Sequence, residues 1–97
     1  MGQRSPSTIR LHGSIRGQLI EILVDGGSTH NFLQELVAIH LGLPIVSSSN
    51  FQVLIGNGDT LSCSGVCLGV ALELDGHTFF VDLFVLSILE ADMLLKV

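Results

Sequence analysis

The chain has 97 residues, of which 47% are hydrophobic and 13% are charged, and its formal net charge is −5 at pH 7. This length and hydrophobic content predict one folded domain and exclude a disordered chain. With only four Lys and Arg residues, the chain lacks a basic stripe that would neutralise phosphates, so we expect no nucleic-acid partner.

No stretch of the sequence resembles a targeting or membrane-spanning segment. Residues 1–7 are polar and lack the apolar core of a signal peptide. Glu21, Asp82 and Glu90 interrupt the longest apolar stretches, which argues against a membrane span. We therefore expect a flexible N-terminal tail over residues 1–7, an intracellular and cytoplasmic location, and no membrane partner.

The two cysteines, Cys63 and Cys67, are four residues apart. On one strand they would lie about 13 Å apart, which is too far for a disulfide bond. A metal site would need further Cys or His ligands close by. We interpret both cysteines as small, buried strand residues and expect no metal site.

The first half of the chain predicts two strands and a helix. Residues 8–15 form the first expected strand, with Gly13 in it and Gly17 after it as weak points. Residues 18–24 are almost all apolar, as in a strand that is buried on both faces. After a glycine-rich turn, Asn31 and Gln34 have the spacing of a helix cap. The expected helix places three apolar residues on one face: Phe32, Leu36 and Ile39.

The second half of the chain predicts mainly β-structure. Gly42 ends the expected helix, and residues 47–50 form an expected polar loop. Asn57-Gly58 and Asp75-Gly76 are hairpin signals. The expected strands are residues 51–55, 60–74, 77–86 and 93–95. Within residues 60–74, apolar residues alternate with small or polar ones: Val66, Leu68, Val70, Leu72 and Leu74. The fold class is therefore mainly β, a small closed barrel with one short helix.

Asp25 carries the chemistry that this pattern suggests. A buried strand would hold its carboxylate rigidly, and the following Gly26 and Gly27 permit a tight turn whose amides can bond the carboxylate. Peptide hydrolysis by carboxylates needs one group that takes a proton from water and another that donates a proton to the carbonyl oxygen. Two close aspartates can share one proton in this way. The sequence has one such strand–Asp–Gly-Gly turn, so the second aspartate would come from a two-fold related copy.

The segment VDGGSTHNFL, residues 24–33, resembles the active-site segment of retropepsin-like proteases of Ty3/gypsy-type retroelements, particularly those of plants. The segment IGNGDTL, residues 55–61, resembles the flap hairpin of that family, and Cys63-Ser64-Gly65 continues the pattern. Residues 80–86, FVDLFVL, and 91–95, ADMLL, resemble its C-terminal half. The match covers residues 8–97, which we expect to form a retropepsin-like aspartic protease domain.

The resemblance implies an acid-protease barrel with one lobe per chain, which acts as a homodimer without a metal or cofactor. Asp25 would be the catalytic residue, and Ser28 could donate a hydrogen bond to its carboxylate and lower its pKa. The active-site turn would comprise Gly26, Gly27, Ser28 and Thr29. The flap and substrate-binding residues would be Ile55, Gly56, Asn57, Gly58 and Asp59. The expected substrate is an extended peptide within the retroelement's own polyprotein.

The sequence departs from the family pattern at three places. Gly26 stands where the family usually has Ser or Thr, whose hydroxyl braces the paired turns across the two-fold axis. Lys96 stands where the family usually has Gly, and the chain ends at Val97, before the family's usual terminal elements. We therefore expect a weaker dimer or lower activity, and we keep a truncated C-terminus as an open alternative.

Two further functions remain as alternatives to an aspartic endopeptidase. The first is a degenerate retropepsin-like module that dimerises or binds peptide but cleaves weakly or not at all. The second is a small β-barrel adaptor that is unrelated to proteases, which requires the whole motif series to be coincidence.

Overall fold

A computed structural model describes residues 8–28, 30–54 and 60–96. The predicted tail at residues 1–7, Thr29, the predicted flap tip at residues 55–59 and Val97 lie outside the described residues. The described elements are β1 (Thr8–Ile15), β2 (Gln18–Asp25), β3 (Phe32–Gln34), α1 (Glu35–His40), β4 (Val46–Leu54), β5 (Thr60–Leu74), β6 (His77–Leu86) and β7 (Met93–Lys96).

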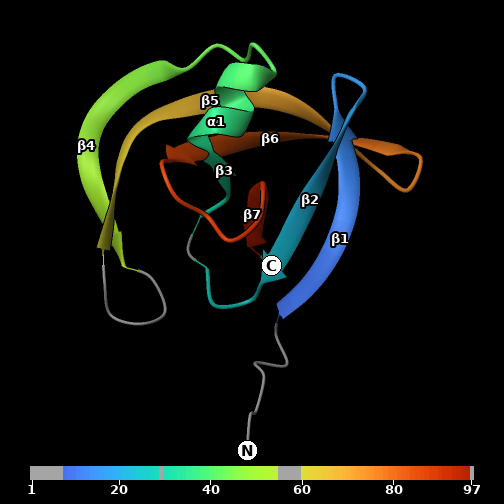
Figure 1. Ribbon diagram of the computed structural model, residues 1–97, viewed down its shortest axis with the longest axis horizontal. Helices are drawn as coiled ribbons and strands as arrows, with labels where there is room; N and C mark the ends of the chain where they lie inside the picture. The colour runs from blue at the N-terminus through green and yellow to red at the C-terminus, as the bar shows by residue number, and fades with distance from the viewer. Residues whose placement is uncertain (1–7, 29, 55–59, 97) are drawn as a thin grey trace, which may run out of the picture.

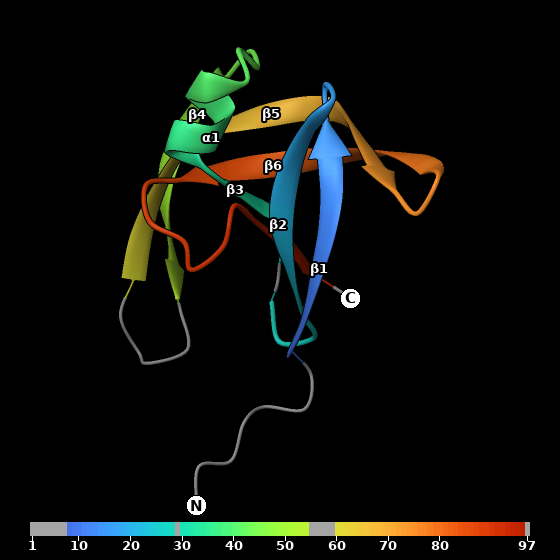
Figure 2. The ribbon, with the colours of Figure 1, turned by 45° about the vertical axis from the view of Figure 1, so that its right-hand side comes forward.

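Because β1 pairs with both β2 and β5, six of these strands form a closed barrel, which Figures 1 and 2 show. The strand order is β1-β2-β7-β3-β6-β5-β4, and β1 pairs again with β5 where Ser14 lies opposite Glu73. A Cβ atom on Gly13 would lie 2.8 Å from the Glu73 carbonyl oxygen, so the closure uses a residue without a side chain. The mainly β class with a small closed barrel and one short helix is thus confirmed.

Two of the tight turns are formed by residues with positive φ. Arg16 and Gly17 have φ of 54° and 77°, and Asp75 and Gly76 have φ of 51° and 80°. These values match the two-residue turns whose twist suits antiparallel hairpins. The predicted Asp75-Gly76 hairpin is confirmed, and Gly17 is a turn residue between β1 and β2.

The helix begins three residues later than the sequence predicted, at Glu35 and not directly after Asn31. The first three residues, Phe32–Gln34, form β3, which pairs with β6 on one side and β7 on the other. Helix α1 follows, and its N-cap residue Gln34 makes no side-chain capping bond. Pairing with two strands outweighed the capping pattern, because it satisfies the backbone groups of β3 while burying Phe32 and Leu33.

Helix α1 turns a different face to the core than the periodicity predicted. Ala38 is fully buried, whereas Leu36 and Ile39 are 70% and 60% exposed. The helix ends near the expected Gly42, whose φ is 68° and whose amide donates to the Ile39 carbonyl. No helix in the described part of the chain is long enough to cross a membrane.

The predicted polar loop at residues 47–50 is part of strand β4. This strand pairs with β5, with Ser47 opposite Gly65 and a register shift between Ser47 and Phe51. Among the described strands β5 is its one neighbour, so β4 forms an edge of the sheet. Polar residues suit an edge strand, and the ladder to β5 outweighed the local composition.

The predicted alternation along β5 changes phase at a bulge. Cys67, before the bulge, and Val70, after it, are both buried on the inner face. Leu68 therefore lies on the outer face, where it is 61% exposed. Gly69 sits at the irregularity with φ of 59°, a conformation typical of a glycine bulge. The Gly69 amide donates a 2.8 Å hydrogen bond to Asp82 Oδ1, so Asp82 has a structural partner at the bulge.

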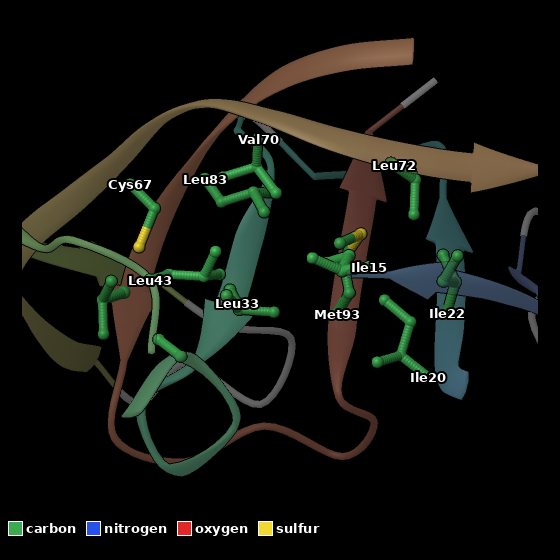
Figure 3. Close-up of a cluster of buried hydrophobic side chains, with 12 residues drawn as sticks. Ile15, Ile20, Ile22, Leu33, Leu43, Cys67, Val70, Leu72, Leu83 and Met93 are labelled. Atoms are coloured by element: carbon green, nitrogen blue, oxygen red, sulfur yellow. The ribbon is translucent and has the colours of Figure 1, made fainter. Parts of the chain in front are cut away.

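The main core lies between β2, β7, β3 and the inner faces of β5 and β6. Figure 3 shows Met93 of β7 between Ile22 of β2 and Leu33 of β3. All three side chains are fully buried. Cys67 belongs to this core and Cys63 to a smaller cluster with Phe32 and Leu86, and both thiols are free. The strands on which Asp25 lies and with which it pairs, β2 and β7, therefore contribute buried side chains to the main core.

Candidate active site

Asp25 is the last residue of β2, and it has a strand on each side. It lies opposite Thr8 of β1 in the antiparallel ladder and beside Lys96 of β7 in the parallel ladder. The preceding Leu23 is buried and Val24 is half-buried against the core. The backbone that carries the carboxylate is thus fixed by two ladders and by apolar packing below it.

The turn after Asp25 holds the carboxylate through a backbone amide. The Gly27 amide donates to Asp25 Oδ1 at 2.9 Å, and the Ser28 amide donates to the Asp25 carbonyl oxygen at 3.2 Å. The Asp25 residue is half-buried, while Gly26 and Gly27 are exposed. One carboxylate oxygen is therefore oriented by the protein.

The prediction that Ser28 donates to the Asp25 carboxylate is wrong for this arrangement of the turn. The Ser28 hydroxyl donates instead to the carbonyl oxygen of His30 at 2.7 Å. Short hydroxyl side chains often bond a backbone group two residues away in this way. Thr29, the last predicted residue of the turn, lies outside the described residues.

The predicted flap residues Ile55, Gly56, Asn57, Gly58 and Asp59 also lie outside the described residues. The strands on either side of them are described and pair in antiparallel register, with Leu54 opposite Thr60. The two stems that the hairpin signal predicted are therefore present.

Two side chains, of Asn31 and Asp92, bond backbone amides of neighbouring strands, and the sequence did not predict these bonds. Asn31 Oδ1 accepts a 2.9 Å hydrogen bond from the Lys96 amide. Asp92 Oδ2 accepts from the Glu21 amide at 2.9 Å, and its carbonyl oxygen accepts from the Gln34 amide at 2.9 Å. The available signal was their position, since each immediately precedes a short apolar strand.

The other aspartates in the described part of the chain have structural positions. Asp75 lies in a hairpin turn, and Asp82 and Asp92 each accept a backbone amide from a neighbouring segment. No three His, Cys, Asp or Glu residues in residues 8–28, 30–54 and 60–96 are grouped so that they could hold a metal ion. Among the described aspartates, Asp25 is therefore the one whose position suits acid–base catalysis.

Asp25 thus presents a carboxylate at the end of β2, oriented by the amide of a glycine-rich turn, in a six-stranded barrel. A family model described as "Retroviral aspartyl protease" matches residues 2–97, so the chain belongs to the retroviral aspartyl protease family. It is a retropepsin-like aspartic protease domain.

The barrel is also similar to a solved structure. The retroviral protease-like domain of Ddi1 from Leishmania major matches with a TM-score of 0.75 and 17% sequence identity, over 93% of this chain and 72% of that one. At this identity the likeness concerns the fold. A comparison with curated proteins finds no relative.

Proposed function

We propose that the chain is one subunit of a homodimeric aspartic endopeptidase, to which each chain contributes one Asp25. The observation that carries this proposal is the 2.9 Å bond from the Gly27 amide to Asp25 Oδ1, at the end of a strand that packs Ile20 and Ile22 into the core. A single carboxylate cannot both accept and donate a proton at the start of the reaction. A two-fold related copy supplies the second one.

The proposed reaction follows from two aspartates that share one proton. The ionised carboxylate takes a proton from water as the water oxygen attacks the peptide carbonyl carbon, and the protonated one donates to the carbonyl oxygen. A proton then passes to the peptide nitrogen, the C–N bond breaks, and a carboxylic acid and an amine are released. The protonation of the two aspartates belongs to the pair.

The proposed substrate is an extended peptide of the chain's own retroelement polyprotein, cut in the cytoplasm. The resemblance of residues 24–33 and 55–61 to Ty3/gypsy-type sequences supports this origin. The paired stems β4 and β5 support a hairpin at residues 55–59 that covers a peptide bound by main-chain hydrogen bonds.

A second candidate function is a retropepsin-like module that dimerises or binds peptide but cleaves weakly. The observation that favours it is Gly26, which is exposed and has no hydroxyl to brace a second turn.

Cleavage of a mixed peptide library between pH 4 and 7 tests the proposal, with Asp25→Asn as the matched control. The proposal expects cleavage by the wild-type chain and none by the variant. Activity that survives in Asp25→Asn would refute the mechanism, and binding without cleavage in both proteins would support the second candidate. Sedimentation across a concentration series would show whether a dimer forms.

A further inference from the structure

The chain leaves the sheet at Asp25 and re-enters it at β3, and both points lie beside the end of β7. On the β2 side, Asp25 pairs with Lys96 in parallel register. On the β3 side, the antiparallel ladder to β7 covers two residue pairs, Phe32 with Leu94 and Leu33 with Met93. The end of β7 at Lys96 therefore extends beyond the backbone ladder of β3.

The side chain of Asn31 extends that short ladder. Its Oδ1 atom accepts the Lys96 amide at 2.9 Å, at the place where a longer β3 would offer a backbone carbonyl. The backbone of Asn31 is also fixed, because its carbonyl oxygen accepts the Phe84 amide of β6 at 2.9 Å. The residue is half-buried, so β6 fixes the Asn31 backbone and the Asn31 side chain fixes the end of β7.

We propose that Asn31 is a positioning residue for Asp25, which acts through the backbone of Lys96. By holding the Lys96 amide, Asn31 keeps the last residue of β7 beside Asp25 and so fixes both ends of the active-site turn to one strand. The orientation of the Asp25 carboxylate toward Gly27 depends on this support. The cleavage part of this inference rests on the proposed function, whereas its structural part does not.

The test compares three variants of the full chain. Asn31→Leu has a similar shape but no acceptor for the Lys96 amide, and Asn31→Asp keeps an acceptor oxygen. The matched control is Asp82→Leu, which removes a chemically similar side-chain acceptor from the Gly69 amide, a 2.8 Å bond on the outer face of β5 and β6. If Asn31→Leu does not fold, Asn31→Ser replaces it, because the shorter serine side chain does not reach the Lys96 amide.

Two amides report on the proposal without any cleavage. In Asn31→Leu, hydrogen exchange at the Lys96 amide should be about fivefold faster or more, the factor that corresponds to one lost hydrogen bond. The NMR signal of the Gly27 amide should also shift, because that amide bonds the Asp25 carboxylate. Asn31→Asp should restore both signals toward the wild-type values, and Asp82→Leu should change neither.

Cleavage gives the third readout, measured at a protein concentration that saturates the dimer. Asn31→Leu should lose about tenfold or more in kcat with little change in KM, because the reacting carboxylate rather than the peptide site is displaced. A Gly27 signal that shifts no more in Asn31→Leu than in Asp82→Leu would overturn the inference. So would an unchanged kcat in a folded, dimeric and active Asn31→Leu. A wild-type chain without activity would contradict the proposed function alone, since the two amide readouts would still decide the role of Asn31.

Discussion

The strands that carry Asp25 and the arm formed by β4 and the adjoining end of β5 are supported in different ways. Strand β2 has a neighbour on each side, and its own residue Ile22 is fully buried in the core. Strand β4 lies on the opposite side of the barrel from β1 (Figures 1 and 2) and has β5 as its one neighbour among the described strands. Its Val46 is 49% exposed. The fold thus places the Asp25 carboxylate on a strand that is paired on both sides, whereas β4 is an edge strand among the described strands.

The largest effect should come from a core substitution under Asp25. Ile22→Ala removes a fully buried side chain from the strand that ends in Asp25, and we expect it to lower the free energy of unfolding by about 2–5 kcal/mol. Val46→Ala on β4 should cost less than about 1 kcal/mol, because half of that side chain is already in water. Urea unfolding of both variants measures the difference, and equal losses would contradict the comparison.

A smaller effect is expected at Gly26, which is exposed above the rigid strand. Gly26→Ser introduces the hydroxyl that the family usually carries there. If the two turns meet across a two-fold axis, each new hydrogen bond should strengthen the dimer by about 1 kcal/mol. Sedimentation and cleavage rates measure the change, with Gly26→Ala as the control without a hydroxyl. No gain of Ser over Ala in either measurement would defeat this explanation.

The smallest effect concerns Cys67, where β5 passes from the arm into the main core. Burial raises the pKa of the Cys67 thiol above its ordinary value, so the folded state favours the protonated form. The stabilising contribution is then complete below the unfolded-state pKa of about 8.5 and is lost as pH rises above it. Unfolding measured from pH 7 to 10 should show a steeper decline for wild type than for Cys67→Ala. Parallel curves would contradict this account.

The sequence was sufficient where a local pattern and the tertiary fold agree. The apolar run before Asp25 and the Asp75-Gly76 turn predicted β2 and the β5–β6 hairpin, because burial and turn conformation act on neighbouring residues. The family pattern predicted the position of Asp25 in the same way, through contiguous residues.

The sequence was insufficient where distant segments decide the structure. Phe32 and Leu33 had a helical spacing with Leu36, but pairing with β6 and β7 made them a strand. The Ser-rich stretch of β4 became a strand because β5 was available beside it. The role of Asn31 at Lys96 joins residues that are 65 positions apart, so no local capping rule could have found it. Gly69 was a local signal of the β5 bulge that strict alternation concealed.

The central claim, that each chain supplies half of one site, is tested most directly by mixing wild-type chain with Asp25→Asn chain at a concentration that saturates the dimer. Mixed dimers would carry a single Asp25 and would not cleave. At a constant amount of wild-type chain, an equal amount of the variant should lower the cleavage rate to about half, because random pairing converts half of the wild-type chains into mixed dimers. A cleavage rate that the variant leaves unchanged would contradict the claim that Asp25 works in a pair from two chains.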